Sequence, residues 1–164
     1  MSRHTQFPSQ LVPPRHVDVW LPPGYDADPT ARYAVLYMHD GQNCFDAADA
    51  AFGVAWEVQY ALERLMAAGR ARPAIIVGVW NLPMRRYLEY RPAKPFRYRS
   101  QPAREVVTAG LGGMPDSDAY LAFLVAELKP FIDATYRTRP GRDDTFIMGS
   151  SMGGLISLYA LCEY

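Results

Sequence analysis

The stretch that decides the fold is Thr145-Phe-Ile-Met-Gly-Ser-Ser-Met-Gly-Gly-Leu155, a short apolar segment followed by a glycine-rich turn and the beginning of an apolar helix. Within it, Gly149 to Gly153 has the form G-x-S-x-G, which places a serine in a sharp turn between a strand and a helix. Glycines two residues before and after the serine remove side chains that would clash in such a turn. The pattern predicts a nucleophile elbow, with Ser151 as the nucleophile.

The start of a helix also suits the chemistry of such a serine. Free backbone N–H groups and the helix dipole favour negative charge there. The N–H of Met152 is therefore expected to stabilise an oxyanion that develops on a substrate carbonyl. The alternatives are a glycine-rich turn without chemistry and Ser150 as the nucleophile, but the register of the motif selects Ser151. Ser157, further into the helix, is expected to pack or to bond the backbone.

Three apolar segments upstream predict further strands. Val17–Leu21 alternates apolar and polar side chains, which is typical of a half-buried strand. Tyr33–Met38 and Ala74–Val79 are continuously apolar, as in strands covered on both faces of a parallel sheet. Between these two, apolar residues recur at helical spacing from Trp56 to Met66, and Gly69 is a plausible end for the helix.

The segment from residue 81 to residue 114 has no clear period and predicts a long functional loop. The arginines and tyrosines from Asn81 to Arg104 suggest a polar or anionic acyl group as a partner. A helix is expected to begin near Asp116 and to carry one apolar stripe as far as Ile132, with a kink or break at Pro130. Strands that alternate with helices predict a single α/β domain over residues 1–164, with a mostly parallel sheet and helices on both faces.

The composition argues against several functional classes. Seventeen basic and seventeen acidic residues give a formal net charge of zero, and no run of like charges predicts a nucleic-acid partner. No apolar run approaches the ~18 residues of a membrane span, and the N-terminus has no apolar region typical of a signal peptide. Cys44 and Cys162 form neither a disulfide framework nor a metal site. We expect a cytoplasmic protein with free thiols and no cofactor; the sequence does not specify its oligomeric state.

A second polar cluster, His39–Asn43, directly follows the second predicted strand. It therefore lies at the carboxyl edge of the sheet, where α/β folds bind ligands. Gly41 would let the backbone approach a substrate closely, and the backbone N–H of Gly41 or Gln42 is the candidate second oxyanion donor. His39 and Asp40 are expected to make structural hydrogen bonds that shape this loop.

The segment that follows the third predicted strand lies at the same edge of the sheet and contributes four further candidates. They are candidates for the lining of the substrate cleft: Asn81, Arg86, Glu89 and Tyr90. The alternative for each of them is a solvated loop residue without a role in binding.

Four motifs, in this order along the chain, resemble the putative-esterase family of α/β-hydrolases. They are Leu36–Asn43, Ile75–Val79 with Arg86–Tyr90, Glu127–Asp133 and Gly149–Gly154. That family includes enterochelin-esterase-like and esterase D-like enzymes, feruloyl and acetylxylan esterases, and mycolyltransferase relatives. The resemblance covers the chain from about Val17 onward and does not specify a substrate.

The resemblance implies a serine hydrolase of small-molecule carboxylic esters, with a Ser–Asp/Glu–His triad and an acyl-enzyme intermediate. It assigns the nucleophile to Ser151 and the oxyanion donors to the backbone N–H groups of Met152 and Gln42. With an alcohol as acceptor, the same site would be an acyltransferase.

The sequence departs from this pattern after the serine. No histidine or aspartate follows Ser151, and the only later carboxylate is Glu163. Family members continue for roughly another hundred residues, so we expect that the C-terminal part of the fold is missing and that this chain alone is inactive. Thr145–Met148 would then be a bare sheet edge. The alternative is a non-catalytic remnant that binds ligands or requires a second polypeptide.

Overall fold

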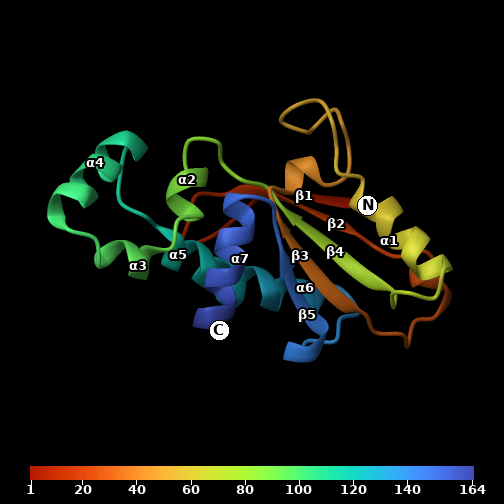
Figure 1. Ribbon diagram of the computed structural model, residues 1–164. Helices are drawn as coiled ribbons and strands as arrows, with labels where there is room; N and C mark the ends of the chain where they lie inside the picture. The colour runs from red at the N-terminus through yellow and green to blue at the C-terminus, as the bar shows by residue number, and fades with distance from the viewer.

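The computed structural model describes the backbone of residues 1–164 and every side chain except that of Leu111. Its centre is one five-stranded sheet with the strand order β1-β2-β4-β3-β5 (Figure 1). Antiparallel pairing joins β1 to β2 and β2 to β4, whereas β4, β3 and β5 pair in parallel. The sheet is therefore mixed, and its parallel half ends at β5. The strands are β1 (Ser2–Phe7), β2 (Arg15–Trp20), β3 (Ala34–His39), β4 (Ala74–Val79) and β5 (Thr145–Met148).

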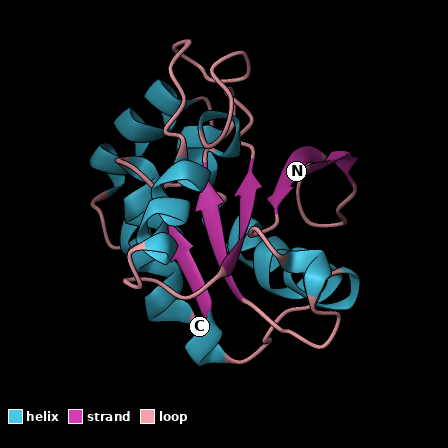
Figure 2. Cartoon of the chain, turned by 90° about the vertical axis from the view of Figure 1, so that its right-hand side faces the viewer, coloured by secondary structure: helices cyan, strands magenta, loops and turns pink.

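Helices cover both faces of this sheet, as predicted (Figure 2). The helix α1 packs through Val58, Leu62 and Met66 on one face, against Met38 and Ile76. The opposite face is covered by α5, α6 and α7 with the π-helix η3 that joins α5 to α6. The helices are α1 (Val58–Ala67), α2 (Arg86–Glu89), α3 (Ala93–Arg97), α4 (Gln101–Leu111), α5 (Ser117–Ala122), η3 (Phe123–Leu128), α6 (Lys129–Thr135) and α7 (Met152–Glu163), with short 3-10 turns at η1 (Tyr25–Ala27), η2 (Gly41–Asn43) and η4 (Arg142–Asp144).

Two parts of the chain are more ordered than the sequence indicated. The N-terminal strand β1 was not predicted; it pairs along β2 and carries Phe7 into the core. The expected loop from residue 81 to residue 114 contains α2, α3 and α4, which extend beyond the sheet (Figure 1). In the described part of the chain, no helix has the length and apolar character needed to cross a bilayer.

The helix predicted from Asp116 to Ile132 is present, but it changes its hydrogen-bond pattern part-way along. Pro130 lies in the first turn of α6, where a missing N–H group is tolerated, and the turns before it form the π-helix η3. Leu128 and Lys129 keep helical backbone angles across the junction. The proline therefore coincides with a change in hydrogen bonding and not with a break in the helix.

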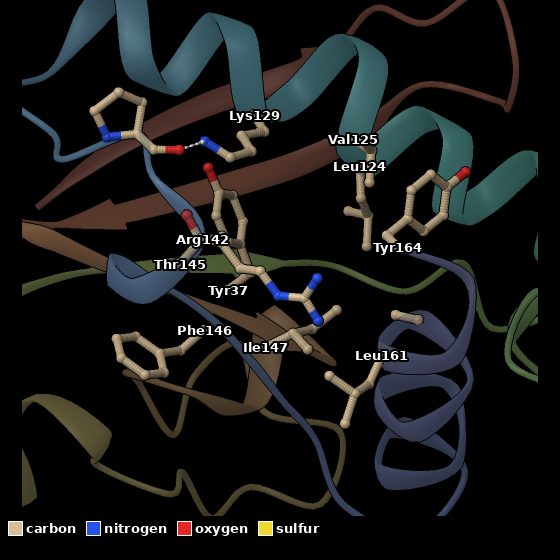
Figure 3. A pocket seen from close by; sticks show the side chains of 12 residues that line it. Tyr37, Leu124, Val125, Lys129, Arg142, Thr145, Phe146, Ile147, Leu161 and Tyr164 are labelled. Atoms are coloured by element: carbon tan, nitrogen blue, oxygen red, sulfur yellow. Dashed lines mark hydrogen bonds between the residues drawn. The ribbon is translucent and has the colours of Figure 1, made fainter.

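The strand β5 forms one free edge of the sheet, since it pairs with β3 and with no other strand among the described residues. Phe146 and Met148 on this strand are 47% and 51% exposed. An apolar groove of about 430 Å³ lies beside the edge, between β5, η3 and the end of α7 (Figure 3). Ala160 in its wall follows Ser151 by nine residues, roughly 13 Å along a helix, so the groove is separate from the serine.

Candidate active site

Ser151 occupies the turn between β5 and α7 in a backbone conformation that residues with side chains seldom adopt. Its φ is 55° and its ψ is −117°. Such positive φ values cost on the order of 1–3 kcal/mol and are concentrated at functional sites. The side chain is exposed, and Met152 begins the helix immediately after it. This geometry is that of a serine held out over the end of a strand at a helix N-terminus.

The glycines of the motif are required by the close packing of this turn. A Cβ atom at Gly149 would lie 2.6 Å from the carbonyl carbon of Gly153, which is closer than Cβ atoms approach in proteins. At Gly153, an added Cβ would lie 3.3 Å from Cβ of His39 and 3.5 Å from Oδ2 of Asp40. The first turn of α7 therefore packs directly on the loop that follows β3.

Of the backbone N–H groups at the elbow, those of Gly153 and Leu155 are used within the turn, whereas that of Met152 is not. Gly153 donates to the carbonyl oxygen of Ser150 at 2.8 Å, and Leu155 donates to that of Ser151 at 3.1 Å. Met152 is the first residue of α7, and the first N–H groups of a helix have no acceptor within it. Its N–H is thus available to a negatively charged oxygen, with the helix dipole in a favourable sense.

The loop after β3 approaches the neighbouring strand as closely as a backbone can. A Cβ at Gly41 would lie only 2.3 Å from the carbonyl carbon of Gly78 on β4, so no larger residue fits without displacing the loop. Asp40 before it has left-handed angles, φ 58° and ψ 45°. Gln42 follows in the first turn of η2, and its side-chain Oε1 accepts a hydrogen bond from the N–H of Asn81 at 3.2 Å.

The buried carboxylate of Asp40 is the centre of a hydrogen-bond network. Its Oδ1 accepts from Nδ2 of Asn81 at 2.6 Å and from Nε of Arg86 at 2.8 Å, and its Oδ2 accepts from Nη2 of Arg86 at 2.8 Å. The Asp40 N–H donates to the hydroxyl of Tyr90 at 3.2 Å. Three residues predicted to line the cleft thus converge on one acid of the loop. The hydrogen bonds that Arg86 donates to the Asp40 carboxylate raise the pKa of Arg86 above its ordinary value.

Tyr90 and Glu89 were expected either to line the substrate cleft or to be solvated loop residues. Both are fully buried, so neither expectation describes them. Burial raises the pKa of Tyr90 well above its ordinary value. Glu89 forms a paired, two-point contact with the buried guanidinium of Arg15, at 2.8 and 2.9 Å, and a third bond to Arg85 at 3.1 Å. The ion pair anchors α2 to β2, and through α2 it holds Arg86 at Asp40.

His39 is buried beneath the same loop. Its Nδ1 lies 2.8 Å from the Tyr120 hydroxyl, and its Nε2 is buried without a partner among the described residues. Burial lowers the pKa of His39 to about 4, so the ring is neutral near pH 7. Burial also raises the pKa of the Cys44 thiol to about 12, which leaves it protonated and a poor nucleophile. Both cysteines are free, as expected.

A second cavity, of about 340 Å³, adjoins the elbow between α3 and the first turn of α7. Met152 and Leu155 form one wall, and the buried Phe96 contributes to the other. Arg91 and Arg99 complete it together with two prolines. The sequence did not identify these residues individually as parts of a binding site, although the many arginines of the segment indicated an anionic partner.

The site combines a strained serine, helix-terminal amides and a glycine loop at the carboxyl edge of the parallel part of the sheet. The sequence of residues 9–164 matches the family described as Putative esterase. The chain belongs to the Putative esterase family. Its fold is that of the α/β-hydrolases.

Solved structures of similar fold include three esterases or hydrolases. An IroE-like serine hydrolase from Shewanella oneidensis has 24% identity and a TM-score of 0.67, with 98% of this chain and 45% of that chain covered. A CE1 ferulic acid esterase from Anaeromyces mucronatus has 22% identity and a TM-score of 0.62, with coverages of 97% and 51%. A siderophore hydrolase from Aspergillus nidulans has 18% identity and a TM-score of 0.63, with coverages of 98% and 51%. The chain therefore spans about half the length of these structures.

Proposed function

We propose that this chain carries the nucleophile and the oxyanion site of a serine hydrolase that acts on small-molecule carboxylic esters. The observation that supports this most directly is the positive φ of Ser151 between a parallel strand and the start of α7. Ser151 Oγ attacks the ester carbonyl, the alcohol leaves, and water then hydrolyses the acyl-enzyme. With an alcohol as acceptor, the same steps constitute acyl transfer.

The oxyanion of the tetrahedral intermediate lies between two backbone donors in this proposal. Met152 supplies one N–H from the start of α7, and Gln42 supplies the second from the first turn of η2. Gly41 lets the second donor approach by packing its backbone on Gly78. Preorganised donors of this kind each contribute about 10²–10³ in kcat in serine hydrolases.

Asn81, Arg86 and Tyr90 act in this proposal as positioning residues. Each of them is hydrogen-bonded to Asp40, immediately before Gly41 and Gln42, and the N–H of Asn81 also donates to the Gln42 side chain. They would therefore fix the loop that carries the second donor, and they would not need to touch the substrate.

The three histidines of this sequence are each hydrogen-bonded or buried in the structure. His4 Nε2 lies 2.8 Å from the Tyr136 hydroxyl, and His16 Nδ1 accepts from the N–H of Gln6. His39 is buried and has a lowered pKa. We propose that the imidazole and the carboxylate that orient and activate Ser151 come from outside this stretch of sequence.

The test is the reaction of the purified chain with p-nitrophenyl acetate. We expect slow release of at most one equivalent of nitrophenol, with the acetyl group located on Ser151 by mass spectrometry. Ser151→Ala should abolish this acylation, whereas the matched control Ser150→Ala should retain it. Acetyl label on Ser150, or a release of nitrophenol that is unchanged in Ser151→Ala, would refute the assignment of the nucleophile. Sustained turnover by the wild-type chain would refute only the proposal of an external base.

A second candidate function is a non-catalytic module that binds ester or acyl ligands. It is favoured by the burial and lowered pKa of His39, the histidine that lies against Gly153 in the elbow. In that case the acetyl group would not be transferred to the protein at all, while ligands would still bind near Met152.

A further inference from the structure

We propose that the cavity between α3 and the first turn of α7 is an anion-binding acyl pocket, in which Arg91 and Arg99 select esters whose acyl group carries a carboxylate or a similar anionic group. This inference rests on the proposed function, because it takes Ser151 as the residue that receives the acyl group. It adds the chemical class of that group.

The position of the cavity ties it to the reacting carbonyl. Met152 is one of the residues that line the cavity, and its backbone N–H is the proposed oxyanion donor. A substrate held with its carbonyl oxygen at that N–H therefore has this cavity beside it. Leu155, one turn further along α7, continues the wall, and its side chain is 42% exposed. The remainder of an acyl chain can extend along this wall toward α3.

The segment that forms the opposite wall is strongly basic. Residues 91–104 contain five basic side chains and no acidic one. Two of these cations are neutralised by carboxylates of other elements: Lys94 pairs with Glu163, and Arg97 pairs with Asp118. Arg91 and Arg99 have no carboxylate partner among the described residues, and these two line the cavity.

The guanidinium of Arg91 in particular has a hydrogen-bond donor that no described residue accepts. The residue is half-buried, and its Nε is buried without a partner among the described residues. A buried donor of this kind is costly unless an acceptor completes it. Guanidinium groups bind carboxylates through paired hydrogen bonds, so a ligand carboxylate is the acceptor whose geometry matches.

The rest of the cavity is apolar, which defines the other half of the ligand. Phe96 is 3% exposed and packs under the cavity with Pro92 and Pro95. An aliphatic or aromatic spacer would contact these side chains, while the anionic end reaches the arginines. The preferred acyl group is therefore amphipathic, with an apolar part next to the carbonyl and a negative charge at its far end.

The experiment compares two esters of equal chain length, mono-p-nitrophenyl glutarate and p-nitrophenyl valerate, which differ in the terminal carboxylate. Binding of both is measured by calorimetry on the full chain with Ser151→Ala, so that no hydrolysis occurs. We expect the glutarate ester to bind about tenfold or more tightly than the valerate ester, as for a charge-assisted contact. Adding Arg91→Met and Arg99→Met should remove that preference.

The matched control is Arg104→Met, which removes one positive charge from the same segment at a side chain outside this cavity. This variant should change the preference for the glutarate ester by no more than about twofold. If it lost the preference as fully as the Arg91 and Arg99 variant, the cause would be general attraction by the basic segment, and the assignment would be overturned. Equal binding of the two esters to the unmodified cavity would also overturn it. These outcomes are independent of whether Ser151 becomes acetylated in the wild-type chain, so failure of the pocket and failure of the nucleophile can be told apart.

Discussion

At the scale of a single residue, the backbone conformation of Ser151 is strained, and the free-energy cost of this strain can be measured. With φ 55° and ψ −117°, it occupies a region open to glycine and unfavourable for side chains. We expect Ser151→Gly to raise the free energy of unfolding by about 1 kcal/mol while removing the nucleophile. Ser151→Ala should bring no such gain, because alanine keeps the Cβ.

Chemical denaturation of the two variants beside the wild type measures this difference. Ser150→Gly is the control, since Ser150 has no positive φ. Equal stability of Ser151→Gly and Ser151→Ala would show that the turn is unstrained. It would then lack the feature on which the proposed nucleophile depends.

His39 makes stability depend on pH in a direction that its burial determines. Unfolded, the ring takes up a proton near pH 6.5, whereas in the folded chain burial lowers its pKa to about 4. The unfolded state therefore binds more protons between these values. The contribution is complete above pH 6.5 and is lost as the pH falls toward 4, by roughly 3 kcal/mol in the free energy of unfolding. Denaturation curves at several pH values should show this slope reduced in His39→Asn, and an identical slope in both proteins would contradict the assignment.

At the scale of elements, the sequence was sufficient to predict those strands and turns whose pattern involves only neighbouring residues. The continuous apolar runs of β3 and β4 and the G-x-S-x-G turn specify structure through neighbouring residues alone, and they were predicted with nearly correct bounds. The helices α2 and α3 were missed because four or five residues are too few to show a helical period. They are held instead by distant partners, such as Arg15 for Glu89.

The same limit applies to the residues around the elbow. The sequence indicated that Asn81, Arg86 and Tyr90 belong to one edge of the sheet, since each follows a parallel strand. It could not indicate that all three bind Asp40, because that network depends on how α2 packs against the loop after β3. Tertiary packing thus joins these candidate cleft residues to the loop that carries Gln42.

At the scale of the whole molecule, the free edge of β5 is the feature with the largest expected consequence. The strand leaves one row of backbone groups unpaired, which is a template for association with another chain. Exposed apolar side chains accompany it: Phe146 and Met148 on the strand are 47% and 51% exposed, and Leu161 of α7, in the wall of the adjoining groove, is 65% exposed. Leu158, three residues earlier on α7, is 59% exposed. Solvent exposure of so much apolar surface in one region is typical of an interface.

We therefore expect this chain, studied alone, to self-associate through that edge. Replacing Leu158 and Leu161 together by lysine should weaken the association roughly tenfold, because each leucine gives up about 1 kcal/mol or more of buried apolar contact. Sedimentation velocity over a range of protein concentrations measures this. Val106→Lys is the control, as Val106 is 74% exposed on α4, away from β5. A wild-type chain that stays monomeric at every concentration would contradict the prediction, as would equal weakening by the control.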